Sequence, residues 1–360
     1  MKKLISLLLL SIFCFSLAGC GQAGRGANEP DAERAGGDTT ADGQPALTIV
    51  TTIFPPYDFA RQIGGQRVEV TQLLPPGTES HSFEPSPQDI IRIQKADLFI
   101  YVGGESDAWV EKILTSLDTS SLRTLTLMDC VEKLEEEIPE GLEGEGFVGH
   151  RHSDDADAGA SADAGASAGA GAGFVPGGSS HADEVEFDEH PWTSPRNAIL
   201  IAEKIAGALS GLDPDHAGEY EANLAAYREE LTALDQEFQA AVESGKRDVI
   251  LFGDRFPFRY FTEAYGLRYY AAFPGCSAES EASAATIAFL IDKIRGEGIP
   301  AVFYLEFSNE KIADILCEDT GAVKLRFHSC HNLSKEDFQN GVTYLDLMRQ
   351  NLTNLKEALS

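Results

Sequence analysis

The chain has 360 residues, 43% of them hydrophobic, which is enough for two domains with cores of their own. Its formal net charge is −30, from 58 acidic and 28 basic side chains. This charge disfavours polyanionic partners, and we expect no binding to nucleic acid, which requires clustered Lys and Arg.

The N-terminus predicts a secretory signal. Two lysines precede an apolar run, Leu4 to Leu17, that is too short to span a bilayer comfortably and ends in Leu-Ala-Gly-Cys. This junction resembles the bacterial lipoprotein box, which implies that residues 1–19 are removed and that Cys20 becomes a lipidated N-terminus. Residues 20–45 are rich in Gly, Ala, Asp and Thr, and we expect them to form a disordered tether. The expected location is extracytoplasmic, on the outer face of the cytoplasmic membrane.

Residues 46–212 are predicted to form an N-terminal α/β lobe. Apolar runs typical of buried strands alternate in it with helical segments, one of which starts at Ser86 and Pro87, a favourable cap and first helical residue. The predicted strands lie at 47–54, 68–74, 97–103 and 122–127. Apolar strands that alternate with helices indicate a parallel sheet covered on both faces.

A long acidic loop interrupts this lobe at about 130–189. Residues 129–190 contain 17 acidic and 2 basic side chains, and the centre is a repetitive Gly/Ala/Ser/Asp stretch. Such a stretch cannot bury enough apolar surface to offset the entropy of ordering, so we expect it to be mobile. Its histidines are predicted to capture metal cations loosely at the mouth of a site. They are His150, His152 and His181.

A long helix is predicted to connect two lobes. Asp213 and Pro214 favour its start, and apolar side chains recur at steps of three and four from Tyr220 to Val242. A helix from Pro214 to Ser244 would be roughly 46 Å long. We assign residues 213–245 to this connection.

Residues 246–360 repeat the strand–helix alternation and are predicted to form a C-terminal α/β lobe. Its strands are expected at 248–252, 267–273, 301–307 and 322–327. Ser334 is predicted to cap a final helix with an apolar face formed by Phe338, Val342, Leu345, Leu352 and Leu355. The predicted fold class is α/β, with two lobes, each a mostly parallel sheet flanked by helices, joined by one long rigid helix.

Three histidines lie at places where such lobes bind ligands. His81 follows the strand at 68–74, His190 ends the acidic loop, and His328 directly follows the last predicted strand. Ligands of open parallel sheets lie beyond the carboxyl ends of the strands, so the three imidazoles could meet in the cleft between the lobes. Three neutral imidazoles with an oxygen donor suit Zn²⁺.

Two motifs resemble those of bacterial zinc and manganese ABC-transporter solute-binding proteins, the cluster A-I family, and of its zinc type in particular. They are "LLPPGTESHSFEPSPQDI" at 73–90 and "DEHPWTSPRNA" at 188–198. The resemblance runs from about residue 46 to the C-terminus, and the acidic loop is similar to the histidine-rich loop of the zinc members. It implies that His81 and His190 are metal ligands and that Zn²⁺ is captured between the lobes. It further implies a monomeric binding protein without enzymatic activity that delivers Zn²⁺ to a membrane ABC permease.

The second lobe departs from the family pattern. Where the family has its third ligand, His or Glu, this chain reads "FGDRFPFRYFTEAYGL" at 252–267. Ungapped counting places Arg255 there, which cannot bind a cation, and one inserted residue places Asp254 there; Asp254 could instead pair with Arg255 or cap a helix. The family's fourth ligand, an Asp, corresponds to His328. We therefore expect His81, His190 and His328 as ligands, with Asp254 and His331 as further candidates.

A disulfide is predicted among the remaining cysteines. Cys276 and Cys330 follow strand ends, and we expect a disulfide between them. Pairing to Cys317 or Cys130, or metal binding as thiolates, are the alternatives.

A Mn²⁺- or Fe²⁺-binding member of the same family is the alternative function, although those ions favour more carboxylate oxygen. A secreted zinc hydrolase would need a general base, and the sequence contains no HExxH; only Asp254 or Glu306 could serve. Surface adhesion is a further role that the sequence leaves open.

Overall fold

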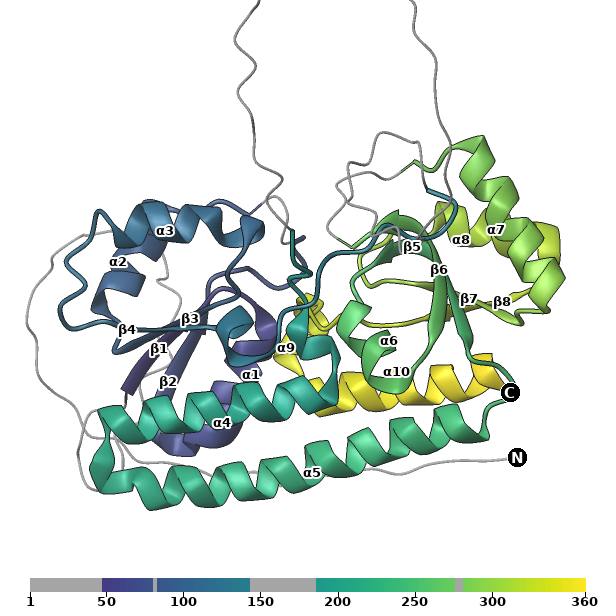
Figure 1. Cartoon of the computed structure of the whole chain (residues 1–360). Coiled ribbons are helices and arrows are strands. Elements are labelled where there is room, and N and C mark those ends of the chain that lie inside the picture. The colour runs from purple at the N-terminus through teal and green to yellow at the C-terminus, as the bar shows by residue number, and fades with distance from the viewer. Residues whose placement is uncertain (1–46, 80–82, 143–185, 276–280) are drawn as a thin grey trace, which may run out of the picture. The chain divides into compact units, whose positions relative to one another are not determined.

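The computed structural model describes residues 47–79, 83–142, 186–275 and 281–360 (Figure 1). The predicted signal and tether and most of the acidic loop lie outside these residues. So do the following candidate residues: Cys20, His81, His150, His152, His181 and Cys276. Within the described ranges, no helix has the length and apolar character needed to cross a membrane.

The first lobe is built on a parallel four-stranded sheet. Its strands have the order β2-β1-β3-β4, with β1 (Leu47–Thr51), β2 (Val68–Gln72), β3 (Leu98–Tyr101) and β4 (Arg123–Thr126). The helices are α1 (Phe54–Gly64), α2 (Pro87–Lys95), α3 (Ala108–Leu114) and α4 (Pro195–Leu212). The central strands β1 and β3 bury residues on both faces, as expected for a covered parallel sheet. The Ser86 side chain caps α2 by accepting the backbone N–H of Asp89, as predicted.

The second lobe repeats this arrangement with the order β6-β5-β7-β8. Its strands are β5 (Val249–Phe256), β6 (Arg268–Pro274), β7 (Ala301–Tyr304) and β8 (Val323–Arg326). Its helices are α6 (Arg259–Tyr265), α7 (Ala284–Glu297), α8 (Lys311–Thr320), α9 (Lys335–Gln339) and α10 (Tyr344–Leu359). Strand β5 runs four residues beyond the predicted 248–252 because an irregularity between Phe252 and Arg255 lets it continue beside β6.

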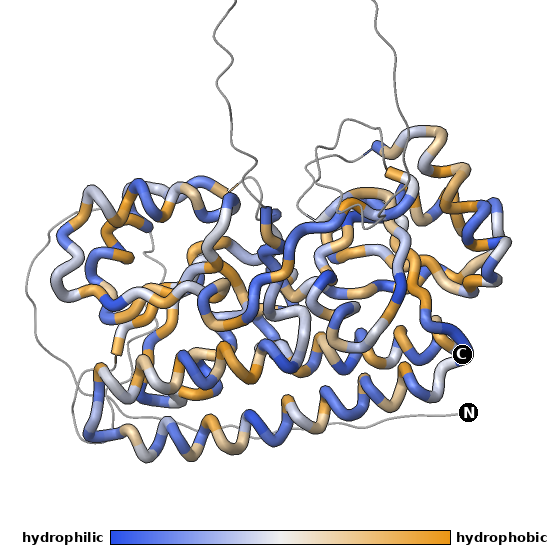
Figure 2. Tube along the Cα trace, viewed as in Figure 1, coloured by the Kyte–Doolittle hydropathy of each residue, from blue (hydrophilic) through white to orange (hydrophobic). Residues whose placement is uncertain are grey.

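The long helix α5 (Ala217–Ser244) follows a short 3₁₀ turn, Pro214–His216, so that together they span the predicted segment. It packs along α4 and α10 (Figure 1). Figure 2 shows hydrophobic and hydrophilic residues alternating along it. Hydrophobic side chains of this helix, such as Leu231 and Phe238, join a core cluster that includes side chains of both lobes. The predicted fold class is confirmed.

The predicted final helix is divided into α9 and α10. Ser334 caps α9 by accepting the N–H of Asp337. Gly341 then adopts a φ of +69°, and Thr343 and Asp346 form a new capping box that starts α10. A left-handed glycine and a second cap end the first helix although the apolar periodicity continues.

The described ends of the predicted acidic loop are ordered by contacts with the second lobe. Residues 134–136 and 186–188 lie side by side, with a backbone bridge between Glu135 and Phe187. These ends differ from the prediction of a mobile loop because they pair with each other and with the second lobe.

Candidate metal site

A small pocket lies where the two lobes meet, at the carboxyl ends of the strands. It is lined by Thr78, Glu79, His190, Arg255, Pro257, Gly275, Leu305, Glu306, Phe307, Ser329, His331 and Asn332. Its volume is about 30 Å³. That is room for a single ion or water molecule, whereas sites for organic ligands measure about 300–1,000 Å³. The pocket therefore fits an ion far better than an organic substrate.

His190 enters this pocket from the first lobe. It directly precedes the 3₁₀ helix Pro191–Thr193, and only 2% of its surface is exposed. Its backbone N–H donates to Oδ1 of Asp188 at 2.8 Å, and the same oxygen lies 3.3 Å from Nδ1 of the imidazole. Burial by itself lowers the pKa of His190, but the charge and hydrogen bond of Asp188 outweigh it, and the net effect is a raised pKa. A carboxylate beside Nδ1 orients the ring so that Nε2 is left for a ligand.

His331 enters from the second lobe, in the loop after β8. Its ring centroid lies 5.6 Å from that of His190 and 5.1 Å from that of Trp192. Trp192 is fully buried, and its indole N–H donates to the carbonyl of Ser329 at 2.9 Å. This bond ties the two segments that carry the imidazoles to each other. The structure thus brings His190 and His331 together.

Glu306 supplies a carboxylate to the same pocket. Its side chain is 7% exposed and accepts the backbone N–H of Ser329 at 2.8 Å and the Ser329 hydroxyl. Burial raises the pKa of this carboxyl to about 7, against the lowering effect of both Ser329 hydrogen bonds. From the sequence, Glu306 is expected only as a possible base for a hydrolase. Glu306 lies just after β7, which ends at Tyr304, whereas the strand predicted at 301–307 includes it, so the sequence does not indicate its place at the strand end.

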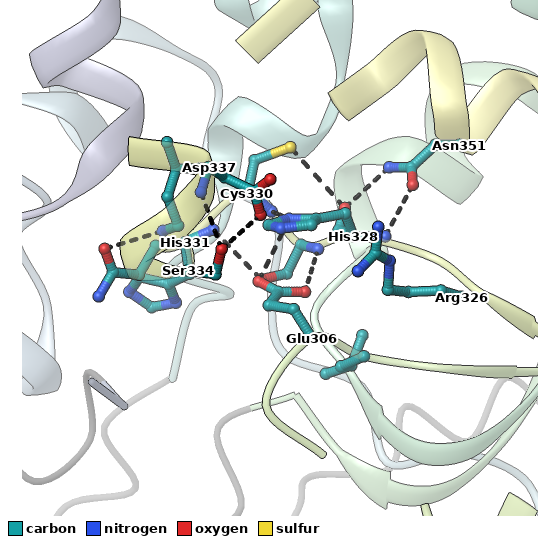
Figure 3. Close-up of polar contacts among 12 residues, drawn as sticks. Glu306, Arg326, His328, Cys330, His331, Ser334, Asp337 and Asn351 are labelled. Atoms are coloured by element: carbon teal, nitrogen blue, oxygen red, sulfur yellow. Dashed lines mark hydrogen bonds and ion pairs between the residues drawn. The ribbon is translucent and has the colours of Figure 1, made fainter. Parts of the chain in front are cut away.

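His328 lies behind the pocket lining. It is 3% exposed, and its Nδ1 accepts the backbone N–H of Cys330 at 2.9 Å. The Asn351 side chain accepts the backbone N–H of His328 at 2.7 Å and donates to the carbonyl of His328 at 2.8 Å (Figure 3). Burial lowers the pKa of His328 to about 3, so the ring is neutral and has one lone pair, which the Cys330 N–H already uses. This geometry argues against His328 as a ligand, and His331 takes its place in the candidate site.

A sharp turn of the backbone separates the two histidines. Cys330 adopts a φ of +61°, a conformation uncommon for residues other than glycine. The turn directs the Cys330 side chain into the core, and Figure 3 shows the imidazole of His331 apart from that of His328. Cys330 is a free, fully buried thiol, and Cys130 and Cys317 are also free. Cys276 lies outside the described residues, so its pairing with Cys330 stays a prediction, although the Cys330 side chain faces the core.

Asp254 does not line the pocket. Its two carboxylate oxygens accept the backbone N–H groups of Arg255 at 2.9 Å and Leu305 at 3.1 Å. Through the Leu305 N–H, Asp254 thus holds the residue that directly follows β7. Arg255 instead reaches the pocket and pairs with Glu79 of the first lobe at 3.0 Å. Both roles are structural, and the pair joins the lobes beside the pocket.

The described donors are an incomplete set. In the described ranges, no three His, Cys, Asp or Glu side chains lie close enough to hold a metal ion together. His190, His331 and Glu306 nevertheless line one pocket, and Thr78 and Glu79 bring the loop that leads to residue 81 to the same place.

Comparison with known proteins identifies the family. A sequence profile of the ZnuA family, described as "Zinc-uptake complex component A periplasmic", matches residues 49–358. The chain belongs to this family. The family predicted from the two sequence motifs is thereby confirmed.

Individual relatives agree with the ZnuA assignment. The zinc-binding lipoprotein AdcA of Streptococcus pneumoniae is 31% identical over 357 residues, 99% of this chain, and the chain spans 61% of that relative's length. The high-affinity zinc uptake system protein ZnuA of Bacillus subtilis is 28% identical over 361 residues, 99% of this chain and 98% of the relative. The crystal structure of the Zn(II)-bound ZnuA-like domain of Streptococcus pneumoniae AdcA has a TM-score of 0.65 at 28% identity, covering 87% of this chain and 99% of that chain.

Proposed function

We propose that this protein captures Zn²⁺ in the pocket between its lobes and delivers it to an ABC permease. The observation that carries the proposal is the meeting of His190 and His331 in an ion-sized pocket, in a chain of the ZnuA family. Zn²⁺ is the cargo in this function, and the relatives named above are described as zinc-binding or zinc-uptake proteins.

The proposed ligands are His81, His190 and His331, with Glu306 as the oxygen donor. Imidazole nitrogens with one oxygen form the four-coordinate shell that Zn²⁺ prefers. Asp188 orients His190, and Ser329 orients Glu306 through two hydrogen bonds. Such outer partners fix the direction of a ligand before the ion arrives.

The surroundings of the site follow from the same proposal. Cys20 carries the lipid that holds the protein at the outer face of the cytoplasmic membrane, and residues 20–45 are the tether. The histidines of the acidic loop, His150, His152 and His181, capture cations loosely and raise their local concentration. The relative AdcA is named a lipoprotein, which supports the anchor. We propose that the protein acts as a monomer.

A metal titration of the soluble chain that starts after Cys20 tests this function. We expect one tightly held Zn²⁺ per chain that excess Mn²⁺ does not displace, and a loss of more than about 100-fold in affinity for His190→Ala, since even outer-shell partners are worth about 10–100-fold. Tighter retention of Mn²⁺ would assign the protein to manganese or iron. An unchanged affinity in His190→Ala would remove the pocket from the function.

A further inference from the structure

A segment of the first lobe crosses to the second lobe next to the candidate site. Residues 131–142, here called the interlobe strap, follow β4 and the 3₁₀ turn Leu127–Cys130, and two of their glutamates contact α6, β6 and α7 of the second lobe. Glu137 pairs with Arg259 at 3.2 Å and accepts the Tyr269 hydroxyl at 3.2 Å. Glu140 pairs with Lys293 at 2.8 Å. The strap is thus held by the lobe opposite to its own sheet.

The chain returns along this strap on its way to His190. The N–H of Glu136 donates to the carbonyl of Glu186, and the N–H of Asp188 donates to the carbonyl of Leu134, each at 2.9 Å. The strap and residues 186–188 therefore form a short antiparallel ribbon. His190 follows two residues later, so the seating of this ribbon on the second lobe determines where the imidazole lies.

The hydroxyl of Tyr260 in α6 joins both strands of the ribbon. It accepts the N–H of Leu134 and donates to the carbonyl of Asp188, each at 3.2 Å. Tyr260 is 3% exposed, and burial raises its pKa to about 12, so the hydroxyl keeps the proton that it donates.

The same short segment is also held by the first lobe. The Glu189 carboxylate accepts the backbone N–H groups of Glu105 and Ser106. Residues 188 and 189, which directly precede His190, are therefore hydrogen-bonded to opposite lobes. A small change in either contact is passed to His190 through two peptide units and through the Asp188 carboxylate beside its ring.

We propose that Tyr260 is a positioning residue for zinc binding, which fixes the first-lobe ligand His190 from the second lobe through the carbonyl of Asp188. This inference rests on the proposed function, because it requires that His190 binds Zn²⁺. The Tyr260 hydroxyl makes the alignment of His190 depend on the correct approach of the two lobes.

Tyr269 provides a matched control. Its hydroxyl also bonds the strap, but at the Glu137 side chain rather than at the backbone that leads to His190, and its ring stacks on Phe256 with the centroids 3.7 Å apart. Tyr→Phe at either position removes one hydroxyl and keeps the ring. A purely structural role of the strap contacts would affect the two variants alike.

The experiment compares Tyr260→Phe, Tyr269→Phe and His190→Ala with the unchanged chain. Zn²⁺ affinity is measured by chelator competition, ligand geometry by the visible spectrum of bound Co²⁺, and folding by the thermal midpoint of the metal-free protein. We expect Tyr260→Phe to weaken Zn²⁺ binding about 10-fold and to change the Co²⁺ spectrum, as outer-shell partners do. Tyr269→Phe should bind within about 2-fold of the unchanged chain, by the same comparison.

Three outcomes would overturn the inference. An unchanged affinity and Co²⁺ spectrum in Tyr260→Phe would show that the hydroxyl does not position His190. An equal loss in both Tyr→Phe variants would show that docking of the strap as a whole is what matters. An unchanged affinity in His190→Ala would defeat the proposed function and this inference with it. Because only this result concerns His190 itself, it distinguishes failure of the proposed function from failure of the inference alone.

Discussion

His328 and His331 are three residues apart in the chain, yet their imidazoles have different chemical surroundings. The ring of His328 accepts a backbone N–H and is enclosed by the core, whereas the ring of His331 is half-buried beside His190 and Trp192. A lone pair that accepts a hydrogen bond cannot at the same time bind a cation. The two residues therefore have separable effects on binding and on stability.

Substitution of each histidine by alanine should separate these effects. His331→Ala should weaken Zn²⁺ binding by more than about 100-fold, more than an outer-shell change. His328→Ala should bind Zn²⁺ within about 3-fold of the unchanged chain but lose about 1–3 kcal/mol of unfolding free energy, because the buried Cys330 N–H loses its acceptor. Chelator competition and urea unfolding measure both quantities. A large loss of affinity in His328→Ala with normal stability would restore His328 as a ligand.

Asp58 predicts a pH-dependent stability. It is 2% exposed and accepts the Tyr344 N–H at 2.9 Å and the Gln62 amide at 3.2 Å. Burial, its largest influence, raises the pKa of Asp58 from 3.8 to about 6. A raised pKa favours the folded state fully below the unfolded value, near pH 4, and this advantage is lost as the pH rises through 6.

Asp58→Asn removes the cost of a buried carboxylate at neutral pH. We expect the variant to be more stable than the unchanged chain at pH 7.5 by up to about 3 kcal/mol, less the weakened Gln62 contact, with the difference vanishing toward pH 4. Urea unfolding at several pH values measures this. A stability difference that stays constant from pH 4 to 8 would contradict it.

At the scale of elements, local caps and turns decided where the chain departs from simple periodicity. The apolar spacing from Phe338 to Leu355 predicts one helix, but Gly341 and the cap at Thr343 divide it. The break places the start of α10 next to Asp58, and Tyr344 packs on Phe59 of α1 with ring centroids 5.0 Å apart. A continuous helix would not present the Tyr344 N–H to that carboxylate, because it would bond within the helix.

The same substitution at two glycines should have opposite effects. Gly341→Ala places a side chain at a φ of +69° in otherwise open space, so it should cost about 1 kcal/mol from backbone strain alone. Gly207→Ala lies on the exposed surface of α4, also in open space, and should gain about 0.5–1 kcal/mol. Thermal or urea unfolding checks both. A stabilising Gly341→Ala would mean that the break between α9 and α10 does not require a left-handed residue.

At the scale of the whole molecule, the two lobes are coupled through polar bridges and a shared core. Asn332 of the second lobe donates to the carbonyls of Pro75 and Thr78 at 2.8 and 2.9 Å and accepts the Gln72 amide at 2.9 Å. It is 2% exposed. The loop that leads to the first proposed ligand is thus held by the opposite lobe, as is the segment before His190.

Asn332→Ala should therefore destabilise the whole protein. Loss of these bonds leaves several buried polar groups without partners, at about 1–3 kcal/mol each, so we expect a drop of about 2–4 kcal/mol in unfolding free energy. Asn354→Ala is the control, because Asn354 is only half-buried and donates one bond to the Arg326 carbonyl within its own lobe. It should cost less than about 1 kcal/mol. Equal effects in urea unfolding would argue that the bridge between the lobes is of no special importance.

The sequence by itself determined the α/β class, the order of strands and helices and the family, and it selected His190 as a candidate ligand. Alternating periodicity, caps such as Ser86 and the motif around His190 act locally and can be read along the chain. It could not distinguish His328 from His331, since both follow the same strand and the choice depends on the left-handed turn at Cys330.

Only the tertiary structure decided which side chains meet. Glu306 reaches the pocket because β7 lies between β5 and β8, and Cys330 joins the core because of the left-handed turn. The ends of the acidic loop lie on the second lobe because Tyr260, Arg259 and Lys293 hold them there. These contacts join residues that are more than a hundred positions apart or depend on the direction of a single turn. Local patterns carry no information about either, because burial and pairing are settled only when the lobes pack.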